Sequence, residues 1–231
     1  IQMQMNMSIQ KYINTGISTG LRLLLLTMPM VIASCDDHEH LDTAIHIGHV
    51  VCSDGRTMSV EECEKMQKEP VAVVFYVSAD GKDGDGLAIG LQELAPVEFS
   101  DTLGVAQGTS ASTDEKDGNA NTYSLYSNNK AGSPLADAVF SVWRYGQSAY
   151  IPSVAEMRLL NASLPAVNSV LRRCGGDAIS EDAGGCWYWT STEVSGQAGA
   201  KAWLYSLGTG AIQETPKTEA HPARIIITLR K

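Results

Sequence analysis

The stretch that decides the fold reads VAVVFYV (residues 71–77), DGKDGDG (residues 80–86) and LAIGL (residues 87–91). The first segment is an almost unbroken run of β-branched and aromatic side chains, which predicts a buried strand near the centre of a sheet. The glycine- and aspartate-rich segment after it predicts a turn. A calcium loop of the EF-hand type is the alternative, but the aspartate spacing and the required glutamate do not occur together. We therefore expect an antiparallel hairpin here.

Helix-start signals flank this hairpin on both sides. Ser59 and Ser153 are each followed three residues later by a glutamate, which is the capping-box pattern. Ser133 precedes a proline, which indicates a helix that extends to about residue 145, and a further helix is expected over residues 165–173. Strands are expected at residues 47–51, 186–191, 201–206, 211–214 and 223–229, and a long polar surface segment at residues 107–133.

Residues 1–34 have the pattern of a secretory signal peptide. A short apolar stretch follows the only two charges of this segment, Lys11 and Arg22. A membrane-spanning helix is the alternative. Pro29 interrupts the apolar run, which also falls short of the about 20 residues needed to span a bilayer. We therefore predict a signal peptide rather than a spanning helix.

This segment ends in IASC (residues 32–35), which resembles the lipobox of bacterial lipoproteins, where the cysteine is acylated. We predict lipidation of Cys35, anchorage to a membrane through the lipid, and a solvated acidic tether over residues 35–46. The DDHEH sequence of the tether also resembles the acidic stretch that directs some lipoproteins of the Bacteroidetes to the outer face of the outer membrane. Surface exposure at the outer membrane is therefore expected. The alternative is a metal site formed by four histidines, His38, His40, His46 and His49. We predict no metal site there.

The charge balance limits the partners of the chain. Lys and Arg number 17 against 26 Asp and Glu, so the formal net charge is −9. An acidic protein is repelled by phosphate backbones and anionic bilayers, so nucleic-acid binding by charge is disfavoured. The chain after the signal peptide is long enough for one domain with its own core, at about 150 residues per domain. We place that domain at residues 47–231.

Four cysteines remain besides Cys35, and an even number in a secreted domain favours two disulfides. Three pairings are possible. We favour Cys52–Cys63 and Cys174–Cys186, because each bond closes a short loop. Free buried thiols are the alternative, and a zinc site is disfavoured because no CxxC pair occurs.

The C-terminal half carries an ordered set of short motifs. YIPSVAEM (residues 150–157) is followed by CWYWTSTE (residues 186–193), AW (residues 202–203) and ARII (residues 223–226). This order resembles the Fibrobacter major paralogous domains, a bacterial C-type-lectin-like family, and their lipoprotein relatives. The resemblance implies an α+β, C-type-lectin-like fold of twisted antiparallel sheets with two or three short helices. It extends to an N-terminal strand and hairpin over residues 47–91.

The chain lacks the EPN, QPD and WND motifs of calcium-dependent animal lectins, so neither calcium-mediated sugar binding nor any cofactor is implied. The motif residues have mostly structural interpretations. Trp189 and Trp203 are predicted to be core residues rather than ligand platforms. Arg224 is expected to be a buried partner of Glu193 or Glu156.

These features favour a non-enzymatic binding or adhesion module on the cell surface, with an extracellular glycan or protein as its ligand. The expected ligand loops are residues 194–200 and 207–220. The candidate ligand-binding residues combine hydrogen-bonding groups with one aromatic ring: Gln197, Lys201, Tyr205, Gln213 and Glu214. An ordinary solvated loop is the alternative interpretation of these residues.

Two other functions stay open. One is a structural subunit of a surface or fimbria-like assembly. The other is an enzyme of the formylglycine-generating type, which shares the general fold and uses a reactive cysteine pair near the C-terminus. The enzyme is disfavoured because the last cysteine, Cys186, is expected in a structural disulfide. Nucleophile-elbow, HExxH and phosphate-loop motifs are also absent from the sequence.

Overall fold

The computed structural model describes residues 44–79, 86–142, 148–182, 184 and 187–229, all within one compact unit of residues 42–231. The predicted signal peptide, the predicted lipidation site at Cys35 and most of the predicted tether lie outside the described residues. So do Cys186 and most of the predicted turn of residues 80–86.

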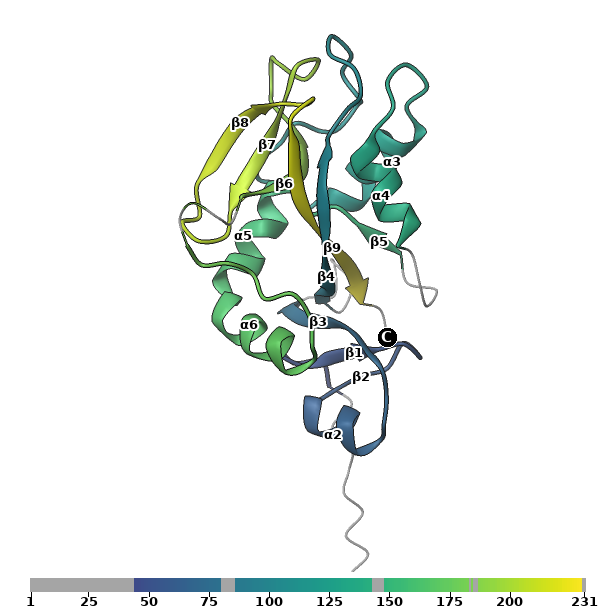
Figure 1. Cartoon of the computed structure of the whole chain (residues 1–231), viewed down its shortest axis with the longest axis vertical. Coiled ribbons are helices and arrows are strands. Elements are labelled where there is room, and N and C mark those ends of the chain that lie inside the picture. Colours follow the sequence, from purple (N-terminus) through teal and green to yellow (C-terminus); the bar gives the residue numbers. More distant parts are fainter. Residues whose placement is uncertain (1–43, 80–85, 143–147, 183, 185–186, 230–231) are drawn as a thin grey trace, which may run out of the picture. The chain divides into compact units, whose positions relative to one another are not determined.

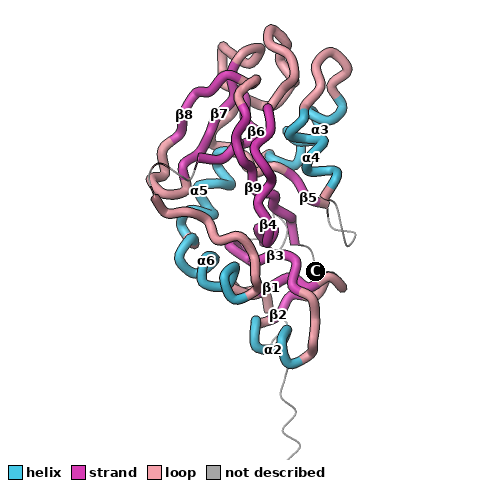
Figure 2. Tube along the Cα trace, viewed as in Figure 1, coloured by secondary structure: helices cyan, strands magenta, loops and turns pink. Residues whose placement is uncertain are grey.

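Six strands form the larger antiparallel sheet, in the order β2-β1-β3-β4-β9-β5 (Figure 2). The predicted hairpin is confirmed: β3 (Pro70–Val77) pairs with β4 (Gly86–Glu98) in the interior of this sheet. β9 (Ala220–Leu229) pairs with the other edge of β4. The remaining strands are β1 (Val50–Cys52), β2 (Thr57–Met58) and β5 (Ala149–Tyr150).

The smaller sheet contains β6 (Trp187–Glu193), β7 (Lys201–Ser206) and β8 (Ile212–Pro216), all antiparallel, with β8 at its edge. The predicted C-terminal strands match β6 to β9 to within three residues at each end. β6 is buried on both faces from Tyr188 to Glu193, whereas β8 at the edge of the sheet is mostly exposed. The fold is therefore α+β with curled antiparallel sheets.

The predicted helix starts are confirmed. Both capping boxes form: the Ser59 and Ser153 hydroxyls accept from the backbone three residues on, and the glutamates there accept from the serine N–H groups. Ser133 caps its helix in the same way. The helices that follow are α2 (Val60–Lys65), α4 (Pro134–Ser141), α5 (Val154–Ala162) and α6 (Leu164–Arg173). Gly175, with φ 69°, takes the left-handed conformation common just after a helix end.

The described residues contain five helices, one more than the four that local signals predict and more than the two or three that the resemblance implies. The main addition is α3 (Gly118–Ser127), which lies inside the predicted polar surface segment. Its sequence carries few apolar side chains, so a periodic pattern could not reveal it. A tertiary contact holds α3 instead: Thr122 is buried, and its hydroxyl accepts from the Ile151 N–H at 2.9 Å. The predicted helix after Ser133 ends at Ser141, and residues 143–147 lie outside the described residues.

Three hydrophobic clusters are buried in the described residues, and two of them connect the sheets to the helices; the third lies on the opposite face of the larger sheet, with Val74, Ala88 and Ile227 among its members. The first joins one face of the larger sheet to α5, α6 and the smaller sheet, with Phe75, Met157 and Tyr205 among its buried members. The second joins α3 and α4 to β9 and the smaller sheet around Trp189. Figure 1 shows α3 and α4 side by side on one flank of the β4–β9 pair, with β7, β8 and α5 on the other flank. The smaller sheet thus contacts both cores.

The predicted disulfide between Cys52 and Cys63 is not formed. Their sulfur atoms lie 3.6 Å apart, whereas a disulfide bond is about 2.05 Å long. Burial and the neighbouring Cys63 thiol raise the pKa of Cys52 to about 12, which disfavours the thiolate that disulfide formation requires. Cys174 is also a free thiol, and the other residue of the predicted Cys174–Cys186 bond, Cys186, lies outside the described residues. Cys52 and Cys63 are therefore free buried thiols, which is the alternative to a disulfide.

Candidate functional site

Three of the five predicted ligand-binding residues meet on one surface of the smaller sheet. Lys201, at the start of β7, donates from its ammonium group to Oε2 of Glu214 on β8 at 3.0 Å. The side-chain amide of Gln197 donates to the same oxygen at 3.1 Å. The Lys201 and Glu214 side chains are 34% and 38% exposed. The three side chains therefore form a hydrogen-bonded cluster that faces solvent.

Trp203 completes this surface, although its sequence motif predicts a core residue. Lys201 and Trp203 are two residues apart on β7 and so lie on the same face. Trp203 is directly opposite Glu214 in the strand pairing, and its side chain is only partly buried against the first core. The alternation of side chains along KAWLY (residues 201–205) already indicates that Trp203 shares a face with the charged Lys201. We refer to Gln197, Lys201, Trp203 and Glu214 as the Trp203 surface.

The backbone that carries Gln197 is held by short hydrogen bonds. The Gln197 N–H donates to the Val194 carbonyl at 2.9 Å, and the Lys201 N–H donates to the Gln197 carbonyl at 2.9 Å. Gly196, with φ 76°, provides the left-handed residue of this turn. The Trp203 surface is therefore built on two paired strands and a turn with its own hydrogen bonds.

The other two predicted residues do not belong to this surface. Tyr205 is 2% exposed and lies in the first core, where burial raises the pKa of its phenol. A surface ligand cannot reach a ring buried to this degree. Gln213 is exposed but pairs with Leu204, so its side chain leaves β8 on the opposite face from Glu214.

A buried ion pair lies beneath the turn. The Lys217 ammonium donates to Oε1 of Glu193 at 2.7 Å and to two backbone carbonyls, those of Val105 at 3.0 Å and Ala198 at 2.9 Å. The carboxylate also accepts from the N–H of Gln107 at 2.8 Å. Both charged side chains are fully buried or nearly so. Because all three ammonium hydrogens have acceptors, the pair fixes the loops on either side of it.

The expected pairing of Arg224 with Glu193 or Glu156 was therefore wrong. The Arg224 guanidinium is buried, donates to the carbonyls of Asp177 at 2.9 Å and Gly90 at 3.2 Å, and lies 4.0 Å from Glu93. Glu156 instead caps α5 and accepts from the Ser153 N–H at 2.7 Å, and its burial raises the pKa of the carboxyl to about 6. The buried Arg224 and Glu156 side chains therefore stabilise contacts within the fold.

A cavity of about 400 Å³ lies elsewhere, at the point where β3 and β4 diverge. Its lining includes Val71, Leu91, Ile225 and Ile227, and Glu69 contributes at the start of β3. None of the predicted ligand-binding residues lines it. No local sequence pattern indicates this cavity, which lies beside an irregularity in the β4–β9 pairing, where the register shifts between Ile89 and Glu93.

The histidines of the rejected metal alternative are only partly described. His46 and His49 make an edge-to-face contact with ring centroids 4.8 Å apart, and His38 and His40 lie outside the described residues. The described part of the chain contains no group of three or more His, Cys, Asp or Glu side chains placed to hold a metal ion. No described helix combines the length and apolar character needed to cross a bilayer.

Comparisons with known proteins add no family assignment. A scan against protein-family models finds no match, and a search of curated proteins finds no significant similarity. The class that the fold and the surface define is thus an α+β protein with a polar and aromatic surface on its smaller sheet. The resemblance to C-type-lectin-like domains stays a prediction.

Proposed function

We propose that this chain is a bacterial surface lipoprotein whose C-type-lectin-like body binds an extracellular glycan or protein through the Trp203 surface. The observation that carries the proposal is a partly exposed tryptophan next to a hydrogen-bonded lysine, glutamate and glutamine. An indole ring offers a flat apolar contact, and the neighbouring groups offer both donors and acceptors. This combination suits a polar ligand with an apolar face.

The charges of the surface support recognition of a ligand that is neutral overall. Lys201 and Glu214 neutralise each other in the absence of a ligand. A ligand that breaks the hydrogen bond between Lys201 and Glu214 must offer an acceptor to Lys201 and a donor to Glu214, because an unpaired charge at a binding surface is costly. A hydroxyl or a peptide group can do so, since each both donates and accepts.

The remaining parts of the proposal come from the sequence. The apolar residues 21–34 and the IASC sequence support lipidation at Cys35, and the acidic tether supports display outside the outer membrane. The motif order of the C-terminal half supports the C-type-lectin-like class. The chain is proposed to act by binding rather than by catalysis, with no cofactor.

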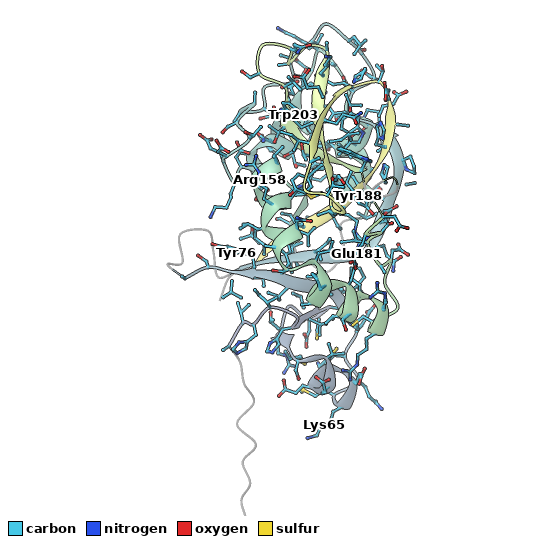
Figure 3. The ribbon with its side chains drawn as sticks, turned by 90° about the vertical axis from the view of Figure 1, so that its left-hand side faces the viewer. Lys65, Tyr76, Arg158, Glu181, Tyr188 and Trp203 are labelled. Carbon is cyan, nitrogen blue, oxygen red and sulfur yellow. The ribbon has the colours of Figure 1, made fainter. Side chains whose placement is uncertain are left out.

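A glycan array probed with the purified full chain, with and without calcium, tests this proposal. Lys201→Ala is the informative variant, and Lys65→Ala is its matched control because Lys65 lies at the opposite end of the body from Trp203 (Figure 3). We expect calcium-independent binding that Lys201→Ala weakens about tenfold and Lys65→Ala leaves unchanged. Equal binding by both variants would place the ligand elsewhere. An empty array together with concentration-dependent assembly would favour a structural subunit.

A further inference from the structure

A second candidate surface lies on α3 and α4. Tyr123 and Tyr126 are 66% and 54% exposed, which is unusual for large aromatic side chains that lie on the same helix. The Tyr126 ring also contacts Phe140 of α4, with ring centroids 4.2 Å apart and an angle of 47° between the planes. We refer to Tyr123, Tyr126 and Phe140 as the α3 aromatic patch.

Burial of α3 does not explain the patch. The helix already buries a separate face, which includes Asn121, Thr122 and Leu125. Tyr123 and Tyr126 are three residues apart, so they are neighbours on the outer face. Asn119 and Ser127, each four residues from Tyr123 and both exposed, flank the rings on that face. The outer face of α3 thus carries two aromatic rings, with an amide before them and a hydroxyl after them along the helix.

Charge limits the chemistry of the ligand. α3 contains no Asp, Glu, Lys or Arg, although the whole chain has a formal net charge of −9. The acidic residues next to the patch are Asp117, at the N-cap of α3, and the exposed Asp137 of α4, and together with the negative net charge they disfavour an acidic ligand. The patch therefore favours a neutral ligand that uses apolar faces and hydrogen bonds together.

We propose that the α3 aromatic patch is a binding site for a neutral glycan. A sugar ring presents C–H groups on its faces and hydroxyls at its edges. The C–H faces match exposed tyrosine rings, and the hydroxyls match the amide of Asn119 and the hydroxyl of Ser127. A protein partner fits less well, because the exposed large apolar side chains of α3 and α4 are these two tyrosines alone among the described residues.

This site is separate from the Trp203 surface, because α3 and β8 lie on opposite flanks of the β4–β9 pair (Figure 1). Its occupancy does not depend on the function proposed above. The proposal therefore stands or fails by variants of α3 alone.

Retention of the purified full chain on three neutral polysaccharides, cellulose, mannan and β-1,3-glucan, tests the proposal, with the acidic polysaccharide alginate as comparison. The key variant is Tyr123→Ala/Tyr126→Ala. Tyr123→Phe/Tyr126→Phe keeps both rings, and Trp203→Ala reports on the other surface. The phenylalanine variant should keep the native thermal melt, and the alanine variant should stay folded with a slightly lower melt, because it removes the contact of Tyr126 with Phe140.

We expect retention on at least one neutral polysaccharide and not on alginate. The double alanine variant should bind about tenfold more weakly or worse, the double phenylalanine variant should bind nearly normally, and Trp203→Ala should retain binding. No retention on any of the three neutral polymers, or equal retention by the double alanine variant, would overturn the proposal. Conversion of a dimer to a monomer by the alanine variant, without loss of glycan retention, would identify a protein interface instead and would equally overturn it.

Discussion

The buried Glu193–Lys217 pair is the residue-level feature on which the loops around the Trp203 surface depend. Loss of one partner leaves the other charge buried without its counterion, which costs about 3 to 5 kcal/mol in comparable sites. We expect Lys217→Ala and Glu193→Ala each to lower the free energy of unfolding by about 3 kcal/mol or more. Urea denaturation measures this change.

The double variant is the control for that prediction. It should be less destabilised than the sum of the single variants, because it leaves no unpaired charge. Additive losses would contradict the interaction between the two side chains.

Glu156 gives the structure a dependence on pH. Its pKa rises from 4.5 to about 6 in the folded chain because the carboxyl is buried. The folded state therefore holds a proton that the unfolded state releases, and stability falls as pH rises from about 4.5 to 6. The loss amounts to about 2 kcal/mol. Glu156→Gln keeps a capping side chain, so it should remove this part of the pH dependence in urea titrations at several pH values. The same dependence of stability on pH in the variant and in the unmodified chain would show that the pKa of Glu156 is not raised by folding.

The thiols of Cys52 and Cys63 are a further residue-scale prediction. Both are buried and reduced, so iodoacetamide should label them slowly in the folded chain and rapidly in urea without reductant. Peptide mapping by mass spectrometry measures the extent of labelling at each of the two thiols. Resistance to labelling in urea, relieved only by reductant, would show that the disulfide expected from the sequence forms in the protein.

At the scale of elements, local signals in the sequence predicted most strands and all three capped helices. Capping depends on residues three apart, and a buried strand such as β3 shows as a short run of β-branched and aromatic residues, so both can be recognised in short windows. α3 could not be predicted in this way, because its stability depends on Thr122 and its contact with Ile151, which is 29 residues away. Long-range contacts of this kind leave no local pattern.

The junction of α3 with α5 gives an element-scale prediction. A Cβ atom on Gly118 would contact the Glu156 carboxylate and would lie 2.6 Å from the Ile151 carbonyl oxygen. Gly118→Ala should therefore destabilise the chain by about 1 to 3 kcal/mol, through overpacking of this junction. Gly184→Ala is the matched control, since nothing lies within 4 Å of its Cβ position, and it should change stability by less than about 0.5 kcal/mol. Equal thermal melts for the two variants would show that α3 does not pack closely on α5.

At the scale of the whole molecule, the α+β class could be predicted from the sequence, but the composition of the candidate site only in part. Gln197, Lys201 and Glu214 were found because they are polar residues in a segment expected to face solvent. Tyr205 and Trp203 exchanged their predicted roles, since one is buried and the other is partly exposed on the same face of β7. The difference is set by how far α5 and the first core cover that face, which is a tertiary property.

The direct test of the central claim compares Trp203→Ala with Trp203→Phe for binding to the glycan array, using the full chain. Phenylalanine keeps a flat aromatic face, whereas alanine removes it. If the Trp203 surface binds the ligand, the alanine variant should lose binding about tenfold or more, and the phenylalanine variant should keep most of it. Both variants should stay folded at the assay temperature, with a lower thermal melt for Trp203→Ala because Trp203 packs against the first core. Binding that is the same in both variants as in the unmodified chain would contradict the account.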